Sequence, residues 1–222
     1  HADHLSAAER VRSATGASLA CGAGITSVQR NFARVFNLPD LPTDGRQFDR
    51  LLREGDTLQL GGLRIRVIET PGHTRDSITY LVGDAAFIGD TLFAPGAGTA
   101  RCDFPGGDAG LLYDSVMKLY DLPPQTRLFL CHDYPAEGAQ AVSGVTVARS
   151  RAENIHIRDG VDKAGFVAQR EARDNTLGLP RLILPALQVN ILGGGAPAPE
   201  DNGVSYLKIP LNSTIEELIA GD

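Results

Sequence analysis

The chain has 222 residues, of which 42% are hydrophobic and 22% charged, a composition typical of a single globular domain. Its formal net charge of -6 argues against nucleic acid or an anionic membrane as the main partner, because both favour clusters of Lys and Arg, and it leaves a small-molecule substrate as the expectation. The sequence contains neither an apolar run of about 18 residues that could span a membrane nor a signal-peptide pattern, so a cytoplasmic location is expected.

Three cysteines, Cys21, Cys102 and Cys131, are scattered along the chain without a Cys-x-x-Cys pair. This spacing favours neither a disulfide framework nor a zinc-thiolate site, and it suits a reducing compartment. Each is interpreted as a small buried side chain. Cys102 is of most interest because it lies between two charged residues in a segment expected near the functional site.

The hydrophobic pattern predicts helices alternating with short strands. Glycine-centred turns join two pairs of strands and predict two hairpins. The predicted helices are 5–14, 28–36 and 109–120, and the predicted strands are 18–21, 56–60, 63–68, 78–82, 85–88 and 127–131.

From residue 148 onward the chain becomes rich in arginine and then in glycine and proline. Five arginines are predicted to lie on helices, namely Arg149, Arg151, Arg158, Arg170 and Arg173. Because this part has too few apolar residues for a core of its own, residues 149–222 are interpreted as an extension that packs on a core formed by residues 1–148. Residues 213–222 receive no role.

Polar motifs follow three apolar strands. His73 lies in Thr70-Pro71-Gly72-His73-Thr74, Asp90 follows Gly89, and His132 follows Cys131. Imidazole nitrogen and carboxylate oxygen suit divalent iron or zinc, and two histidines with one carboxylate form a common iron site. The joint occurrence of these motifs predicts a metal site. His156 alternates with apolar neighbours and is interpreted as structural.

The chain opens on His1-Ala2-Asp3-His4, the right-hand part of the metal-binding pattern His-x-His-x-Asp-His. The first histidine of that pattern lies upstream of His1 and is absent from this chain.

These motifs resemble the metallo-β-lactamase superfamily. Within it, Arg101-Cys102-Asp103-Phe104, His132-Asp133-Tyr134-Pro135 and the tail motifs 154–160, 170–174 and 187–190 resemble the bacterial branch of the persulfide dioxygenases, the relatives of the ethylmalonic encephalopathy protein. The resemblance implies an α+β fold, the αββα sandwich, with the N-terminal strands missing from this chain.

The resemblance also implies site residues. His73 and Asp90 would bind one Fe(II) together with the absent upstream histidine, and zinc is the alternative metal. Four further residues match positions that form a second shell in the dioxygenases or bind a second metal in dinuclear relatives, namely His1, Asp3, His4 and His132. Asp90 and Tyr134 are the predicted catalytic residues. Arg101 and Tyr134 are the predicted substrate contacts, Arg101 through a glutathione carboxylate or by holding the site through Asp103.

The function implied is iron-dependent oxidation of glutathione persulfide by dioxygen to glutathione and sulfite in a bacterial cytoplasm, with a homodimer as the expected assembly. The alternative is a thioester hydrolase of the glyoxalase II kind with two metals and a bridging hydroxide. A third interpretation is a non-catalytic fragment that mediates assembly, supported by the missing ligand alone. Metal count and identity distinguish the first two.

Overall fold

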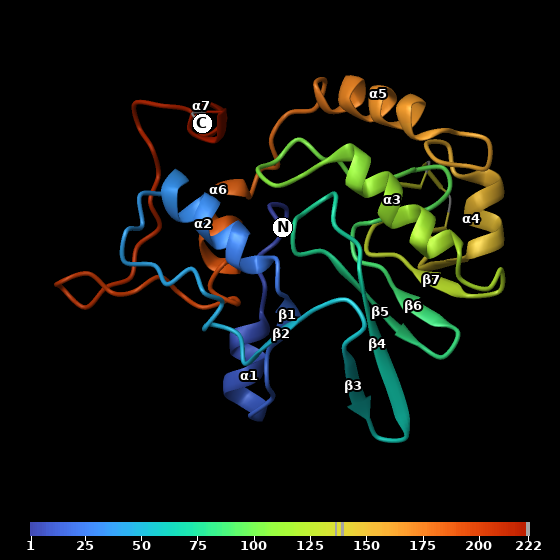
Figure 1. Cartoon of the computed structure of the whole chain (residues 1–222). Coiled ribbons are helices and arrows are strands. Elements are labelled where there is room, and N and C mark those ends of the chain that lie inside the picture. The colour runs from blue at the N-terminus through green and yellow to red at the C-terminus, as the bar shows by residue number, and fades with distance from the viewer. Residues whose placement is uncertain (136, 139, 221–222) are drawn as a thin grey trace. The chain divides into compact units, whose positions relative to one another are not determined.

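The computed structural model describes residues 1–135, 137, 138 and 140–220, and it comprises two compact units (Figure 1). The central unit contains residues 52–177, and the terminal unit combines residues 1–51 with residues 178–222. Both units contain strands and helices, which confirms the predicted α+β class. The predicted domain boundary between residues 148 and 149 stays a prediction.

The central unit is built on a six-stranded sheet with the strand order β3-β4-β5-β6-β7-β8. Its strands are β3 (Thr57–Leu60), β4 (Leu63–Glu69), β5 (Ile78–Val82), β6 (Ala85–Phe87), β7 (Arg127–Phe129) and β8 (Gly144–Thr146). Both predicted hairpins are confirmed: Leu60 pairs with Leu63 beside the first turn, and Val82 pairs with Ala85 beside the second.

The direction of the strands brings three polar motifs to one edge of this sheet. β4 and β6 both pair with β5 in antiparallel fashion, so they run in the same direction, and β7 pairs with β6 in parallel. The carboxyl ends of β4, β6 and β7 therefore meet at the same edge. The loops that leave these ends carry His73, Asp90 and His132.

Helix α3 (Ala109–Tyr120) has the bounds predicted from its amphipathic pattern. It begins at Asp108, whose Oδ1 accepts a hydrogen bond of 2.8 Å from the Leu111 N–H, the usual way to satisfy a free amide at a helix start. The buried residues of α3 pack with those of β6 and β7 in one core, which includes Ala86, Leu112, Val116, Leu119 and Leu128. This packing holds α3 against the sheet, next to the edge at which β4, β6 and β7 end.

The described part of the central unit also contains the helices α4 (Val147–Glu153) and α5 (Lys163–Asp174), and α5 runs beside α3. The prediction that Arg158 lies on a helix is wrong. The chain turns at Asn154, whose Oδ1 accepts hydrogen bonds from the N–H groups of His156 and Ile157. These bonds favour a turn in place of a continued helix.

The terminal unit joins the two ends of the chain. It contains α1 (Ala8–Thr15), β1 (Ala20–Gly22), α2 (Ile25–Val35), β2 (Arg50–Leu52, whose last residue belongs to the central unit), α6 (Ile183–Asn190) and α7 (Ile215–Ala220). The buried side chain of Gln29 on α2 donates to the Ile191 carbonyl at 2.9 Å and accepts from the Gly45 N–H at 3.0 Å. The side-chain amide of Gln29 thus connects α2 with segments that are distant in the sequence.

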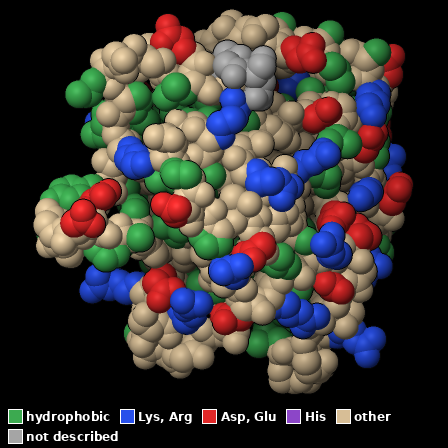
Figure 2. Space-filling view, turned by 60° about the vertical axis from the view of Figure 1, so that its left-hand side comes forward, with side chains coloured by type: hydrophobic (Ala, Val, Ile, Leu, Met, Phe, Trp, Pro, Cys, Tyr) green, Lys and Arg blue, Asp and Glu red, His purple; other side chains and the backbone are tan. Residues whose placement is uncertain are grey.

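Four elements lie outside the predicted set: β2, β8, α6 and α7. Helix α6 contains Pro185, but this proline occupies the first turn, where a helix needs no amide donor. In the described part of the chain, every helix is too short or too polar to cross a membrane. On the face shown in Figure 2, acidic and basic side chains are interspersed, in keeping with the absence of Lys and Arg clusters from the sequence.

Candidate metal centre

The loop that carries His73 is held by helix α3. The Gly72 carbonyl accepts a hydrogen bond of 2.8 Å from the Asp108 N–H, and the Pro71 carbonyl accepts one of 2.6 Å from the Ser115 hydroxyl. Gly72 has a φ of 144° and lies against the backbone of Leu112. The Pro-Gly pair therefore allows the loop to approach the helix closely enough for both bonds to form.

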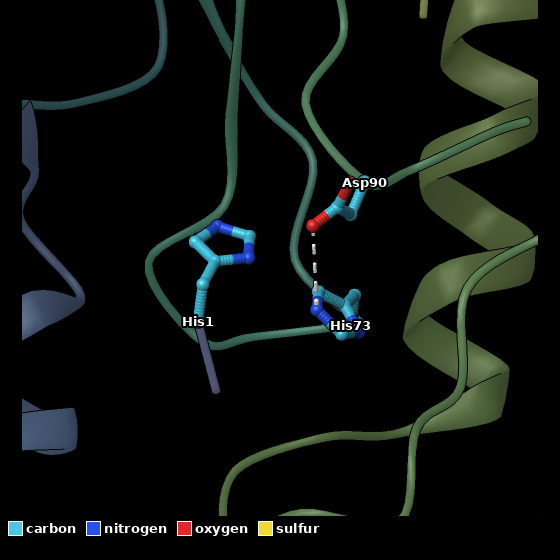
Figure 3. Close-up of side chains that lie close together, drawn as sticks. All are labelled: His1, His73 and Asp90. Carbon is cyan, nitrogen blue, oxygen red and sulfur yellow. Dashed lines mark ion pairs between the residues drawn. The ribbon is translucent and has the colours of Figure 1, made fainter. Parts of the chain in front are cut away.

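The imidazole of His73 has a defined orientation. Its Nδ1 lies 2.7 Å from the carbonyl oxygen of Arg101, and a carbonyl can only accept, so Nδ1 carries the proton. The other nitrogen, Nε2, then presents a lone pair, and it lies 3.7 Å from Oδ2 of Asp90. Figure 3 shows the two side chains facing one another. A backbone carbonyl that fixes the tautomer of a ligand in this way is a usual feature of metal sites.

Asp90 follows β6 and is more buried than His73 and His132, with 6% of its side chain exposed. Its two carboxylate oxygens face different imidazoles. Oδ2 lies toward His73, and Oδ1 lies 3.4 Å from Nε2 of His132, which follows β7. The sheet therefore brings His73, Asp90 and His132 together, as the sequence predicts.

The donor set fits a divalent cation. Ligand atoms that bind one metal at about 2.1 Å, with angles of about 90–120° between them, lie roughly 3.0–3.6 Å apart, close to the separations found here. A buried carboxylate is costly unless positive charge compensates it, and a cation would supply that charge. His73 and Asp90 are thus suited to bind a metal ion.

Two aromatic side chains, Tyr134 and Phe93, contact His132. The imidazole of His132 stacks on the ring of Tyr134 at a centroid distance of 5.9 Å and an interplanar angle of 10°, while Phe93 contacts both of these rings edge-on. Tyr134 is 67% exposed. These contacts place the Tyr134 ring beside the metal centre.

The backbone carbonyl of Arg101 contacts His73 of the candidate metal centre, and the side chain of Arg101 contacts Asp103. The guanidinium Nε donates to Oδ1 of Asp103 at 2.6 Å, and the same group stacks over the ring of Phe104 at 4.6 Å. The pKa of Arg101 is raised chiefly by its hydrogen bond with Asp103. The side chain therefore braces the segment 101–104.

Cys102 is buried, as predicted, and burial raises the pKa of its thiol to about 12, with the nearby Asp174 carboxylate adding to the effect. Cys21 is half-buried. The prediction of burial is wrong for Cys131, which is exposed because it lies just beyond the end of β7. His156 has the structural role predicted for it, since its Nδ1 accepts a hydrogen bond of 3.0 Å from the Thr99 N–H.

The motif His1-Ala2-Asp3-His4 belongs to the terminal unit. The rings of His1 and His4 lie 5.5 Å apart, and Nδ1 of His4 donates to Oδ1 of Asp3 at 3.1 Å. Asn190 at the end of α6 holds the backbone of this motif. Its Nδ2 donates to the carbonyls of His1 and His4 at 2.9 and 2.8 Å, and its Oδ1 accepts from the N–H of Ser6 at 2.8 Å.

Residues 1–132 match the family model of the metallo-beta-lactamase superfamily. The chain belongs to this superfamily. It is 53% identical to a probable metallo-hydrolase of Burkholderia pseudomallei over 96% of this chain and 76% of that protein. It is 46% identical to glyoxylase B2 of Dictyostelium discoideum over 96% of this chain and 74% of that protein.

Among solved structures of this superfamily, the chain is similar to ETHE1 from Myxococcus xanthus, with a TM-score of 0.70 and 31% identity over 88% of this chain and 74% of that one. The metallo-β-lactamase fold predicted from the sequence is confirmed. The protein is an enzyme of a family that acts on small-molecule substrates and carries His and Asp residues suited to bind a metal.

The sequence predicts the candidate metal-binding residues of the central unit but indicates no role for Asn190 or Asp174. Both lie in tail motifs noted for their resemblance to the family. Their partners are backbone groups far away in the sequence, so only the fold reveals what they hold.

Proposed function

We propose that this enzyme oxidises glutathione persulfide with dioxygen to glutathione and sulfite, using one Fe(II) per chain. The likeness to ETHE1, a persulfide dioxygenase, is the observation that carries this proposal, because it extends over most of both chains at 31% identity. The segment Arg101-Cys102-Asp103-Phe104, which resembles the same family, supports it.

His73 and Asp90 are the proposed metal ligands of this chain. In the family motif the third ligand is the first histidine of His-x-His-x-Asp-His, and the positions that His1, Asp3, His4 and His132 match have supporting roles. Bound iron would supply the redox chemistry that the protein's own side chains lack. The contribution of His73 depends on the Arg101 carbonyl, which keeps Nε2 available as a ligand.

Two residues are proposed to act on the substrate side. The ring of Tyr134 is exposed beside the candidate centre, which supports the proposal that its hydroxyl donates a hydrogen bond to a bound persulfide. For Arg101, the pairing with Asp103 favours the second of its two predicted roles, which is to hold the site segment. We expect Tyr134→Phe to raise KM, and Arg101→Lys to lower stability and activity together, because lysine lacks the forked contact with a carboxylate.

The test is an assay of oxygen consumption by the iron-loaded protein with glutathione persulfide. The balanced reaction uses persulfide, dioxygen and water and yields glutathione, sulfite and two protons, so the amounts of dioxygen consumed and sulfite formed are equal. Asp90→Asn abolishes both signals under this proposal. Oxygen uptake that is absent, or that persists unchanged in Asp90→Asn, contradicts it.

A dinuclear thioester hydrolase of the glyoxalase II kind is the second candidate. One observation favours it: Asp90 turns one oxygen to His73 and the other to His132, so these three residues would suit a site that holds two metals. The names of the metallo-hydrolase and glyoxylase relatives agree with it. Hydrolysis of S-lactoylglutathione by a protein with two metals per chain would establish this function in place of the first.

A further inference from the structure

The peptide between Arg101 and Cys102 is bound on both sides. Its carbonyl oxygen accepts the proton of His73 Nδ1 at 2.7 Å, and its N–H donates to Oδ2 of Asp174 at 2.8 Å. The carbonyl and the N–H of a trans peptide point in opposite directions in one plane. A single peptide unit therefore connects the imidazole of His73 with a carboxylate at the end of helix α5.

Asp174 is itself held firmly. Its Oδ1 accepts a hydrogen bond of 2.7 Å from Nη2 of Arg170, one turn earlier on α5, and each of these side chains is only 4% exposed. Nη1 of Arg170 also donates to the carbonyl of Thr99 at 3.2 Å. Arg170 and Asp174 thus hold the segment 99–102 by hydrogen bonds at two points, the carbonyl of Thr99 and the N–H of Cys102.

This arrangement has a chemical consequence for His73. A carboxylate that accepts from a peptide N–H polarises the peptide, and this strengthens the carbonyl on its other side as an acceptor. A stronger acceptor favours the tautomer of His73 with the proton on Nδ1 and raises the basicity of Nε2. In many metal sites a carboxylate does this to a histidine by direct contact.

We propose that Asp174 is a positioning residue for His73, acting on the metal ligand through the Arg101–Cys102 peptide. Arg170 has a different part in this proposal: it pairs with Asp174 and holds the segment through the carbonyl of Thr99, whereas Asp174 accepts from the peptide that His73 uses. The inference rests on the proposal that His73 binds the metal, and it holds for an iron dioxygenase and a dinuclear hydrolase alike.

The test compares Asp174→Asn with Arg170→Gln in the full chain, using Co²⁺ alone as the probe and a chromogenic chelator as competitor. Both substitutions break the buried ion pair and should lower the urea midpoint, but only Asp174→Asn changes the group that accepts from Cys102. We expect Asp174→Asn to weaken Co²⁺ binding about tenfold, the lower end for residues that support a ligand, and Arg170→Gln to change it less than about twofold. Glu153→Gln, which removes an exposed ion pair of the same spacing with Arg149, is the matched control.

A second readout uses the metal-free protein. Nitrogen-15 shifts of the histidine rings report the tautomer, and Asp174→Asn should raise the share of His73 with its proton on Nε2, while Arg170→Gln leaves it unchanged. Should Asp174→Asn fail to fold, the double variant Arg170→Gln with Asp174→Asn restores a neutral pair and takes its place.

Unchanged affinity and tautomer in the Asp174 variant would overturn the proposal. An equal loss of affinity in Arg170→Gln would also overturn it, since the effect would then be general loosening. Neither readout involves persulfide or thioester turnover, so failure of the proposed function shows up separately, as lost oxygen uptake with Co²⁺ binding intact.

Discussion

Substitution of Gly72 by alanine should destabilise the protein and disturb its metal centre. A Cβ at this position would lie 2.5 Å from the backbone nitrogen of Leu112, where ordinary contacts are 3.4–4 Å. The atom belongs to the backbone of α3, which is fixed by the core, so it cannot move aside at small cost. The φ of 144° adds strain for any residue with a side chain.

The size of the effect follows from these two terms. Unfavourable backbone geometry costs about 1–3 kcal/mol, and forced overpacking costs about 1–3 kcal/mol more, so we expect a loss of about 4 kcal/mol in the free energy of unfolding. Gly83, in the β5–β6 turn, is a matched control: its φ is 59°, but an added Cβ would meet nothing within 4 Å. Gly83→Ala should therefore cost only about 1 kcal/mol.

The assay is urea unfolding of both variants, followed by Co²⁺ titration at a urea-free condition where both are folded. The Gly72 variant should lose about 3 kcal/mol more than the Gly83 variant and bind Co²⁺ more weakly, because the loop that carries His73 must move. A difference below about 0.5 kcal/mol would refute the view that close contact with α3 positions this loop.

Three further predictions concern groups that are not proposed metal ligands. Asn190→Ala removes three hydrogen bonds to the segment 1–6 and should lower the free energy of unfolding by about 1–3 kcal/mol in urea titrations. A loss under about 0.5 kcal/mol would contradict the view that Asn190 holds this segment. Burial, aided by Arg170, lowers the pKa of His156 below its ordinary 6.5, so the unfolded chain binds a proton more readily and stability falls as pH drops below about 6.5. The loss of stability per pH unit should be smaller in His156→Asn. An equal loss in both proteins would contradict a lowered pKa of His156. Iodoacetamide at pH 8 should modify exposed Cys131 well before Cys102, whose pKa of about 12 leaves almost no thiolate; equal rates by mass spectrometry would contradict the burial of Cys102.

Strands β3 to β7 of the central sheet and the candidate site can be predicted from the sequence because their signals are local. Alternating strands joined by glycine turns indicate the hairpins, and each apolar strand is followed directly by its polar motif. The helix over residues 109–120 was readable from its amphipathic pattern and the prolines that follow it. His73, Asp90 and His132 could therefore be placed together before the fold was known.

The remaining features depend on contacts between distant segments. Asn190 holds residues more than 180 positions away, and Asp174 reaches Cys102 across 72 positions. Short elements such as β8 and α7 carry too few residues for a periodic pattern. The pattern around Arg158 predicts a helix, whereas the side chain of Asn154 turns the chain there.

The most direct test of the proposed function is the content of iron and zinc per chain, measured by elemental analysis of the protein purified without oxygen. About one iron and little zinc per chain is the result predicted for a persulfide dioxygenase. Two metals per chain would contradict that account and favour the thioester hydrolase.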